Sequence, residues 1–200
     1  VDRIHNQNSY KHRILYYGPS SSKDLLATIN QYHQVPAALK DIPAGNEYAY
    51  LETPVTKVLV APYDAKQIYM AQISNLDKKY DPAIEPIRAL YDEYFGGGMN
   101  SIVFQEMRET RGLAYSAWAS IMPPSYLKYP YVLRTQIATQ NDKMIDAVTT
   151  FNDIINNMPE SEAAFKLAKD GLTNRLRTER IIKGDIIWSY INAQDLGQNV

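Results

Sequence analysis

Residues 94–116 read YFGGGMNSIVFQEMRETRGLAYS and hold the most informative pattern of the chain. Three adjacent glycines, Gly96–Gly98, would each cost about 1 kcal/mol relative to alanine inside a helix. They therefore end one helix and let the backbone turn before the next. Gly112 does the same between a second, charged helix and the segment after it. The stretch predicts a helix, a glycine turn, a short helix, a second turn and a strand.

The flanking sequence extends this order in both directions. Asp81 and Pro82 suit the N-cap and the first position of the helix that ends at Gly96, while Ser22, Ser101 and Ser161 are candidate N-caps of other helices. Apolar periodicity predicts the remaining elements. We expect strands over 12–17, 56–61, 66–74, 113–122 and 131–138, and helices over 23–33, 81–95, 101–110, 141–155, 161–176 and 186–196.

The order of these elements predicts the fold class. Residues 56–61 and 66–74 flank a turn at 62–65, so we expect them to pair as a hairpin. Strands followed by paired helices are typical of an α+β protein, with an antiparallel-type sheet and helices packed on one face. The pattern stops at Val200 after a helix, so we expect the domain to be incomplete at its C-terminus and the chain to be a fragment of a longer protein.

Composition excludes several classes of function. The 200 residues carry 21 basic and 22 acidic side chains, a net charge of −1, with no basic block. We therefore expect no nucleic-acid partner. Cysteine is absent, which removes disulfides and thiolate metal sites. No apolar run approaches 18 residues, so we expect no transmembrane helix, and no signal peptide is recognisable. The 16 tyrosines are expected mostly at half-buried strand and surface positions.

The three histidines, His5, His12 and His33, do not form a zinc motif. A catalytic zinc site needs two imidazoles on one helical face, a carboxylate ligand and a glutamate that takes a proton from the bound water. None of the three has a histidine partner three or four residues away. We interpret all three as ordinary surface or strand-edge side chains and expect no metal in this chain.

Residues 94–116 resemble the second-domain signature of the M16 family of zinc metallopeptidases, the pitrilysin and insulinase superfamily that includes mitochondrial processing peptidase. In that family two halves of the same α/β fold close on a peptide, and one half carries zinc on the inverted motif His-x-x-Glu-His with a further glutamate. The resemblance places this chain in the zinc-free, C-terminal-type half. It implies no cofactor in this chain and a zinc ion in the partner half.

The resemblance also implies two site residues. The zinc-free half contributes an arginine and a tyrosine seven residues apart, which here correspond to Arg108 and Tyr115. Their expected roles are binding of the substrate backbone and stabilisation of the oxyanion, for which a guanidinium and a phenol supply donors. Without the signature, an exposed arginine and a strand tyrosine would be interpreted as a solvated charge and a packing residue. We assign the neighbours Glu109 and Arg111 to surface salt bridges.

These inferences lead to one main hypothesis and two alternatives. The chain is expected to be the substrate-binding half of an M16-type metallopeptidase, inactive alone, whose partners are a peptide or protein substrate and a zinc-binding half. The first alternative is a non-catalytic, structural or peptide-binding M16 homologue, and the second is an unrelated α+β interaction domain. A parent sequence with His-x-x-Glu-His would favour the enzyme.

The expected organisation has two parts. Residues 1–45 resemble the strand and helix that close a preceding domain, and residues 46–200 make up most of the next. If the source is bacterial, we expect the periplasm or another cell-envelope compartment. An exposed sheet edge and apolar face in the isolated chain would favour a homodimer.

Overall fold

The computed structural model describes residues 6–45 and 52–198, which fall into two compact units. The first unit contains residues 6–45 and 181–194 with Gln198, and the second contains residues 52–180 and 195–197. Within the described part of the chain, no helix is long and apolar enough to cross a bilayer.

The first unit carries helix α2 (Ser22–Tyr32) and most of helix α7 (Gly184–Asp195). Ser21, rather than the predicted Ser22, caps α2, since its hydroxyl accepts a hydrogen bond from the amide of Asp24 at 3.2 Å. The strand predicted over 12–17 is wrong. The nearest pairing is an isolated parallel bridge between Tyr10 and Lys40. Residues that favour strands form one only where another strand pairs with them. No described segment pairs with residues 12–17.

The second unit is built on a three-stranded antiparallel sheet. Its strands are β1 (Gln67–Lys79), β2 (Ser116–Met122) and β3 (Pro130–Gln140), in the order β1-β3-β2. The register places Met70 and Ala117 opposite Ile137. Cross-strand partners share a face, so these three side chains point to the same side of the sheet.

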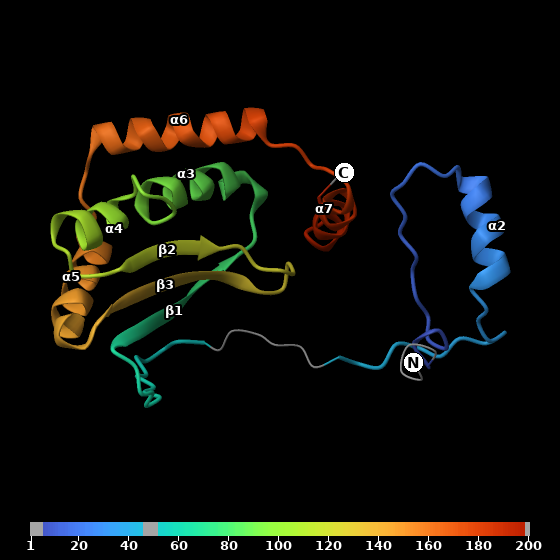
Figure 1. Cartoon of the computed structure of the whole chain (residues 1–200), viewed down its shortest axis with the longest axis horizontal. Helices are drawn as coiled ribbons and strands as arrows, with labels where there is room; N and C mark the ends of the chain where they lie inside the picture. The colour runs from blue at the N-terminus through green and yellow to red at the C-terminus, as the bar shows by residue number, and fades with distance from the viewer. Residues whose placement is uncertain (1–5, 46–51, 199–200) are drawn as a thin grey trace. The chain divides into compact units, whose positions relative to one another are not determined.

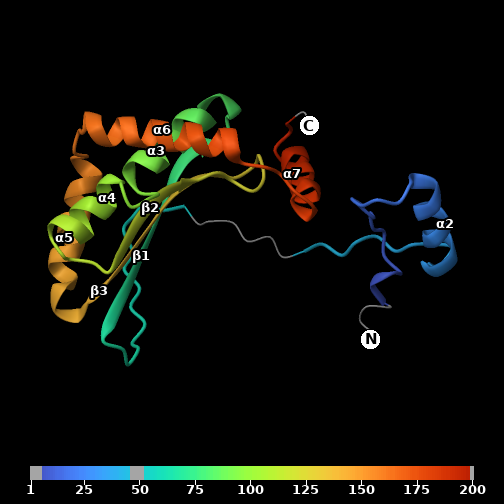
Figure 2. The same cartoon turned by 45° about the horizontal axis from the view of Figure 1, so that its top comes forward.

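Helices cover that side (Figures 1 and 2). Their bounds, in chain order, are η1 Pro82–Ile84, α3 Glu85–Phe95, α4 Ile102–Phe104, η2 Gln105–Thr110, η3 Asn141–Lys143, α5 Met144–Asn156 and α6 Glu162–Thr178. Side chains of the helices and of the covered sheet face form one buried core, among them Phe95, Val103, Met107, Phe151, Ala119 and Ile137. The predicted α+β class, with helices on one face of an antiparallel sheet, is confirmed.

Gly96 lets the end of α3 lie directly against β2. It is the C-cap of α3, as predicted, with φ −141°. A Cβ atom there would overlap the carbonyl oxygen of Ala119 and lie 2.5 Å from its amide nitrogen. The first glycine of the triplet is therefore required by close packing of two backbones, beyond its role in ending the helix.

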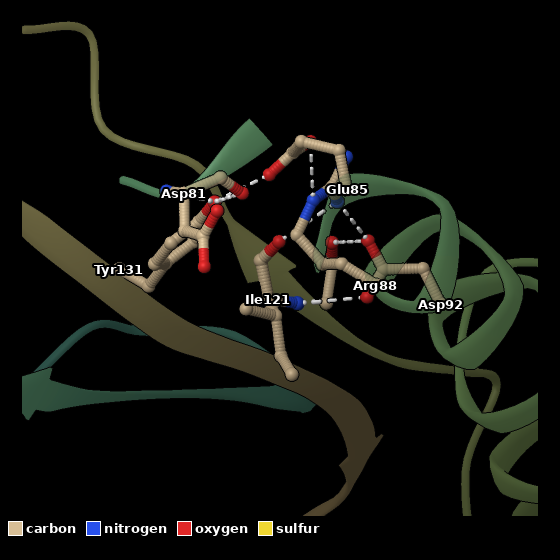
Figure 3. A network of polar contacts seen from close by, with 7 residues as sticks. Asp81, Glu85, Arg88, Asp92, Ile121 and Tyr131 are labelled. Carbon is tan, nitrogen blue, oxygen red and sulfur yellow. Dashed lines mark hydrogen bonds and ion pairs between the residues drawn. The ribbon is translucent and has the colours of Figure 1, made fainter. Parts of the chain in front are cut away.

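Charged side chains of α3 cover the outer edge of β2 (Figure 3). The carboxylate of Asp92 accepts a hydrogen bond from the amide of Ile121 at 2.8 Å, and the guanidinium of Arg88 donates to the carbonyl of Ile121 at 3.0 Å. Arg88 and Asp92 also form an ion pair at 2.7 Å. The outward polar groups of Ile121 are thereby satisfied, which protects this edge from pairing with another chain.

The same network reaches β3 through Tyr131. Its buried hydroxyl donates a hydrogen bond to Glu85 at 2.5 Å, and Glu85 pairs with Arg88 at 2.9 Å (Figure 3). Burial, reinforced by the bond to Glu85, raises the pKa of Tyr131 to about 12. Burial also raises the pKa of Asp92, against the opposing effects of the Ile121 and Ser120 hydrogen bonds and of Arg88. We interpret the network as a brace between α3 and the sheet.

The predicted hairpin between 56–61 and 66–74 is present only in part. Residues 67–79 form β1, which is longer than predicted, but residues 56–61 form no strand. The predicted helix over 101–110 is a three-residue α-helix followed by six π-helical residues.

Candidate functional site

Arg108 lies on the π-helical turn η2, which the core fixes from one side. Ser101 caps the preceding turn by accepting a hydrogen bond from the amide of Phe104 at 3.4 Å. Met107 is fully buried, whereas the Arg108 side chain is 46% exposed. The buried residue anchors the turn, so the next side chain along it projects outward. The guanidinium carbon of Arg108 lies 5.1 Å from the centre of the Phe104 ring.

A tight turn then returns the chain to the sheet. Gly112 has φ +56°, a left-handed conformation that glycine adopts without strain, as the sequence predicts for a helix end. The carbonyl of Met107 accepts hydrogen bonds from the amides of Leu113 at 2.8 Å and Ala114 at 3.2 Å. The amide of Tyr115 donates to the carbonyl of Ala138 at 2.8 Å. The turn and β3 together fix the backbone on both sides of Tyr115.

This geometry brings the two predicted site residues together. The guanidinium carbon of Arg108 lies 5.6 Å from the centre of the Tyr115 ring, within the range of a cation–π contact. The Tyr115 side chain is 70% exposed. Among the described residues, no group forms a hydrogen bond with the Tyr115 hydroxyl or with the guanidinium of Arg108. Both therefore keep donors available to a ligand.

A shallow cavity of about 280 Å³ adjoins the pair at the end of the sheet. Its walls come from the start of β1, the end of β3, the turn before β2 and the short helices η2 and η3. They consist of Gln67, Arg108, Gly112, Leu113, Ala114, Tyr115, Thr139, Gln140 and Lys143. Two of these nine residues are cationic and none is acidic. The cavity suits carbonyl or carboxylate oxygens better than cations.

The neighbours of Arg108 form the ion pairs of an exposed surface. Arg111 lies 3.4 Å from Glu106, and the Nε atom of Arg108 lies 3.6 Å from a carboxylate oxygen of Glu109. Exposed pairs of this kind contribute little to stability. The partner of Glu109 is thus the predicted site residue Arg108. The sequence analysis assigned Glu109 to a surface salt bridge but did not predict this partner.

Thr139 and Lys143 are site residues that sequence reasoning missed. The hydroxyl of Thr139, which is 2% exposed, donates to the carbonyl of Leu113 at 2.5 Å. The ammonium of Lys143 donates to the carbonyl of Gly112 at 3.0 Å. Both residues hold the turn between Arg108 and Tyr115 from a strand and a helix that follow later in the chain. No local pattern marks them, because the contacts arise only when the sheet forms.

Comparison with known proteins identifies the family. Residues 14–172 match the family model described as the peptidase M16 inactive domain, which covers most of the chain. The chain belongs to the peptidase M16 inactive domain family. No curated protein matches the sequence significantly.

Two solved structures resemble this M16 domain. A conserved protein from Enterococcus faecalis V583 is 18% identical, with a TM-score of 0.58, over 90% of this chain and 41% of that chain. A peptidase M16 inactive domain from Pseudomonas fluorescens is 18% identical, with a TM-score of 0.48, over 66% of this chain and 30% of that chain. The first likeness shows a shared fold. The M16 domain described here spans less than half the length of either protein.

The histidines of this M16 domain do not fit the zinc site of the family. The Nε2 atoms of His12 and His33 lie 2.7 Å apart, and Nδ1 of His12 lies 2.7 Å from the carbonyl of Tyr10. The two rings therefore bond to each other through their Nε2 atoms. Nowhere in the described ranges do three histidine, aspartate or glutamate side chains form a metal-binding group. His5 lies outside the described residues.

Proposed function

We propose that this chain is the substrate-binding, zinc-free half of an M16-type metallopeptidase. The observation that carries the proposal is the convergence of Arg108 and Tyr115 on one cavity at the end of the sheet. Membership of the M16 inactive domain family supports it. In this function the chain contributes donors to the site, and a partner half supplies the zinc and the activated water.

The two side chains suit different parts of that task. The guanidinium of Arg108 presents several N–H donors in one plane and can bind two carbonyl oxygens of an extended peptide. The phenol of Tyr115 presents a single O–H donor, which suits the oxygen that becomes negative when water attacks the scissile carbonyl. Their mutual contact restricts both side chains before substrate binds, so less conformational entropy is lost on binding.

We further propose that residues 1–45 close a preceding domain and that residues 46–200 make up most of the inactive domain. The repeated architecture of the M16 family motivates this division.

Peptide cleavage by this chain combined with its zinc-binding half tests the function. We expect Arg108→Ala and Tyr115→Phe each to lower kcat by roughly 100- to 1000-fold, the effect typical of losing one oxyanion donor. Arg111→Ala is the matched control, since Arg111 follows on the same segment but does not line the cavity. Full activity in both site variants would refute the assigned roles.

The same experiment distinguishes the enzyme from the non-catalytic alternative. A partner half without His-x-x-Glu-His, together with peptide binding that depends on Arg108 but produces no cleavage, would identify a peptide-binding homologue.

A further inference from the structure

The cavity beside Arg108 and Tyr115, here called the Arg108 cavity, has two cationic residues that differ in their partners. The Nε atom of Arg108 lies 3.6 Å from a carboxylate oxygen of Glu109. Lys143 is partly buried, and in the described part of the chain no carboxylate lies within ion-pair distance of its ammonium. Its neighbour Asp142 is exposed and does not line the cavity. Removing a charge from water is costly without a counter-charge, so Lys143 favours an anionic ligand.

Lys143 is held at the turn that joins the two proposed site residues. It ends η3, directly after β3, and its ammonium donates to the carbonyl of Gly112 at 3.0 Å. Gly112 lies between Arg108 and Tyr115 in the chain. An ammonium has three N–H donors, and the described residues engage only this one, so two remain for a ligand. A substrate bound by Arg108 and Tyr115 therefore meets a fixed positive charge beside them.

A further wall of the Arg108 cavity adds an amide donor. Gln67 at the start of β1 and Gln140 at the end of β3 are cross-strand partners, and both line the cavity. The hydroxyl of Tyr69 donates to Oε1 of Gln67 at 3.3 Å, which engages the oxygen of that amide and leaves its NH₂ group to donate. A carboxylate accepts hydrogen bonds at two oxygens and donates none. It therefore matches walls that supply N–H donors and positive charge better than a neutral amide does.

We propose that the Arg108 cavity selects a carboxylate group of the substrate and that Lys143 determines this specificity. The specificity rests on the proposed function, in which the occupant of the cavity is a peptide. Arg108 and Tyr115 bind oxygens of the peptide backbone, whereas Lys143 distinguishes a carboxylate from an uncharged amide of the same size. An acidic side chain and a C-terminal carboxylate both present this group. The chain therefore prefers acidic peptides to neutral ones of the same length.

Binding of matched peptides to the full chain, without any zinc-binding half, tests this specificity. The probes are alanine-based peptides with acetylated and amidated ends that carry either one glutamate or one glutamine. A third peptide carries the glutamine and a free C-terminal carboxylate. NMR titration of the unaltered chain measures each dissociation constant. We expect the glutamate peptide to bind roughly 10- to 100-fold more tightly than the glutamine peptide, the effect of hydrogen bonds to a charged group.

Variants of Lys143 assign the preference to its side chain. In Lys143→Met we expect the ratio of the two dissociation constants to fall to about 1, because only the glutamate peptide loses a charged partner. Lys143→Arg should retain the preference. Lys66→Met is the matched control, since Lys66 precedes Gln67, is exposed and does not line the cavity. A ratio is unaffected by any change in the turn that weakens both peptides equally.

Each outcome decides the assignment. Tighter binding of the third peptide alone, lost in Lys143→Met, would support the carboxylate site and assign the chain terminus as its source. Equal binding of all three peptides, no binding of any at millimolar concentration, or an equal loss of preference in Lys66→Met would overturn it. The cleavage assay of Arg108→Ala and Tyr115→Phe is independent of these ratios. Failure of the carboxylate site therefore remains distinguishable from failure of the proposed function.

Discussion

At the scale of single residues, Thr139 and Thr135 show how differently one residue type acts on the same strand. The hydroxyl of Thr139 satisfies the Leu113 carbonyl in the turn between Arg108 and Tyr115. The hydroxyl of Thr135, also fully buried on β3, has no hydrogen-bond partner among the described residues. The two positions therefore form a matched pair for measuring the value of one buried hydrogen bond.

We predict that Thr139→Val lowers the free energy of unfolding by about 1–3 kcal/mol, because the partly buried Leu113 carbonyl loses its donor. Thr135→Val should leave stability unchanged or raise it, since it replaces an unpaired hydroxyl with a methyl group of similar size. Urea unfolding measures both. Equal losses in the two variants would show that the Thr139 bond contributes nothing beyond packing.

At the scale of secondary-structure elements, the contact between α3 and β2 depends on a missing side chain. Gly96→Ala would drive a methyl group into the backbone of Ala119. We predict a destabilisation of about 1–3 kcal/mol or more, as for overpacking in a core. Gly98→Ala is the control, since its Cβ would meet only the end of the Glu93 side chain, at 3.8 Å. Thermal unfolding should show a large loss for the first variant and little change for the second.

The brace between α3 and the sheet predicts a loss of stability at alkaline pH. The pKa of Tyr131 is raised from 10.0 to about 12, so the folded state binds the phenolic proton more tightly than the unfolded state does. The resulting stabilisation is complete below pH 10 and is lost as the pH rises to about 12. The pKa of Tyr91 is raised to about 12, mainly by burial, and acts in the same direction.

Chemical unfolding between pH 9 and pH 12 measures this effect. We expect Tyr131→Phe to be less stable at neutral pH, because it loses the bond to Glu85, but to lose less further stability as the pH rises. In the double variant Tyr91→Phe with Tyr131→Phe, the free energy of unfolding should fall even less as the pH rises. If the free energy of unfolding of both variants fell with pH as steeply as that of the unaltered chain, the loss of stability at alkaline pH could not be assigned to these two phenols.

At the scale of the whole molecule, one face of the sheet carries no helix from the described residues of its own unit. Tyr69 and Ile73 of β1 and Met122 of β2 are exposed on it. We predict that the isolated chain self-associates through this face, most simply as a two-fold dimer at micromolar concentration. Ile73→Lys should weaken association, whereas Ile145→Lys, at an exposed apolar position on α5, should not. Sedimentation showing a 22.8 kDa monomer for the unaltered chain would refute the prediction.

The sequence alone determined the features whose hydrogen bonds are local. The helices before and after Gly96–Gly98, the caps Asp81, Ser101 and Ser161, and the left-handed Gly112 all follow from preferences of neighbouring residues, and the structure has each of them. The same stretch also carried the family resemblance, because its glycines and charged helix are contiguous. The roles of Arg108 and Tyr115 came from that resemblance and stay predictions.

Tertiary structure decided the features that depend on distant partners. The runs at 12–17 and 56–61 are also rich in β-branched and aromatic residues, but a strand is stable only where another strand supplies its hydrogen bonds. Tertiary structure brings together the walls of the Arg108 cavity, the Thr139 and Lys143 contacts with the turn, and the contact of His12 with His33. These contacts join residues that lie from 21 to as many as 76 positions apart in the sequence. Such contacts are set by packing of the core and the register of the sheet, which no short stretch of sequence specifies.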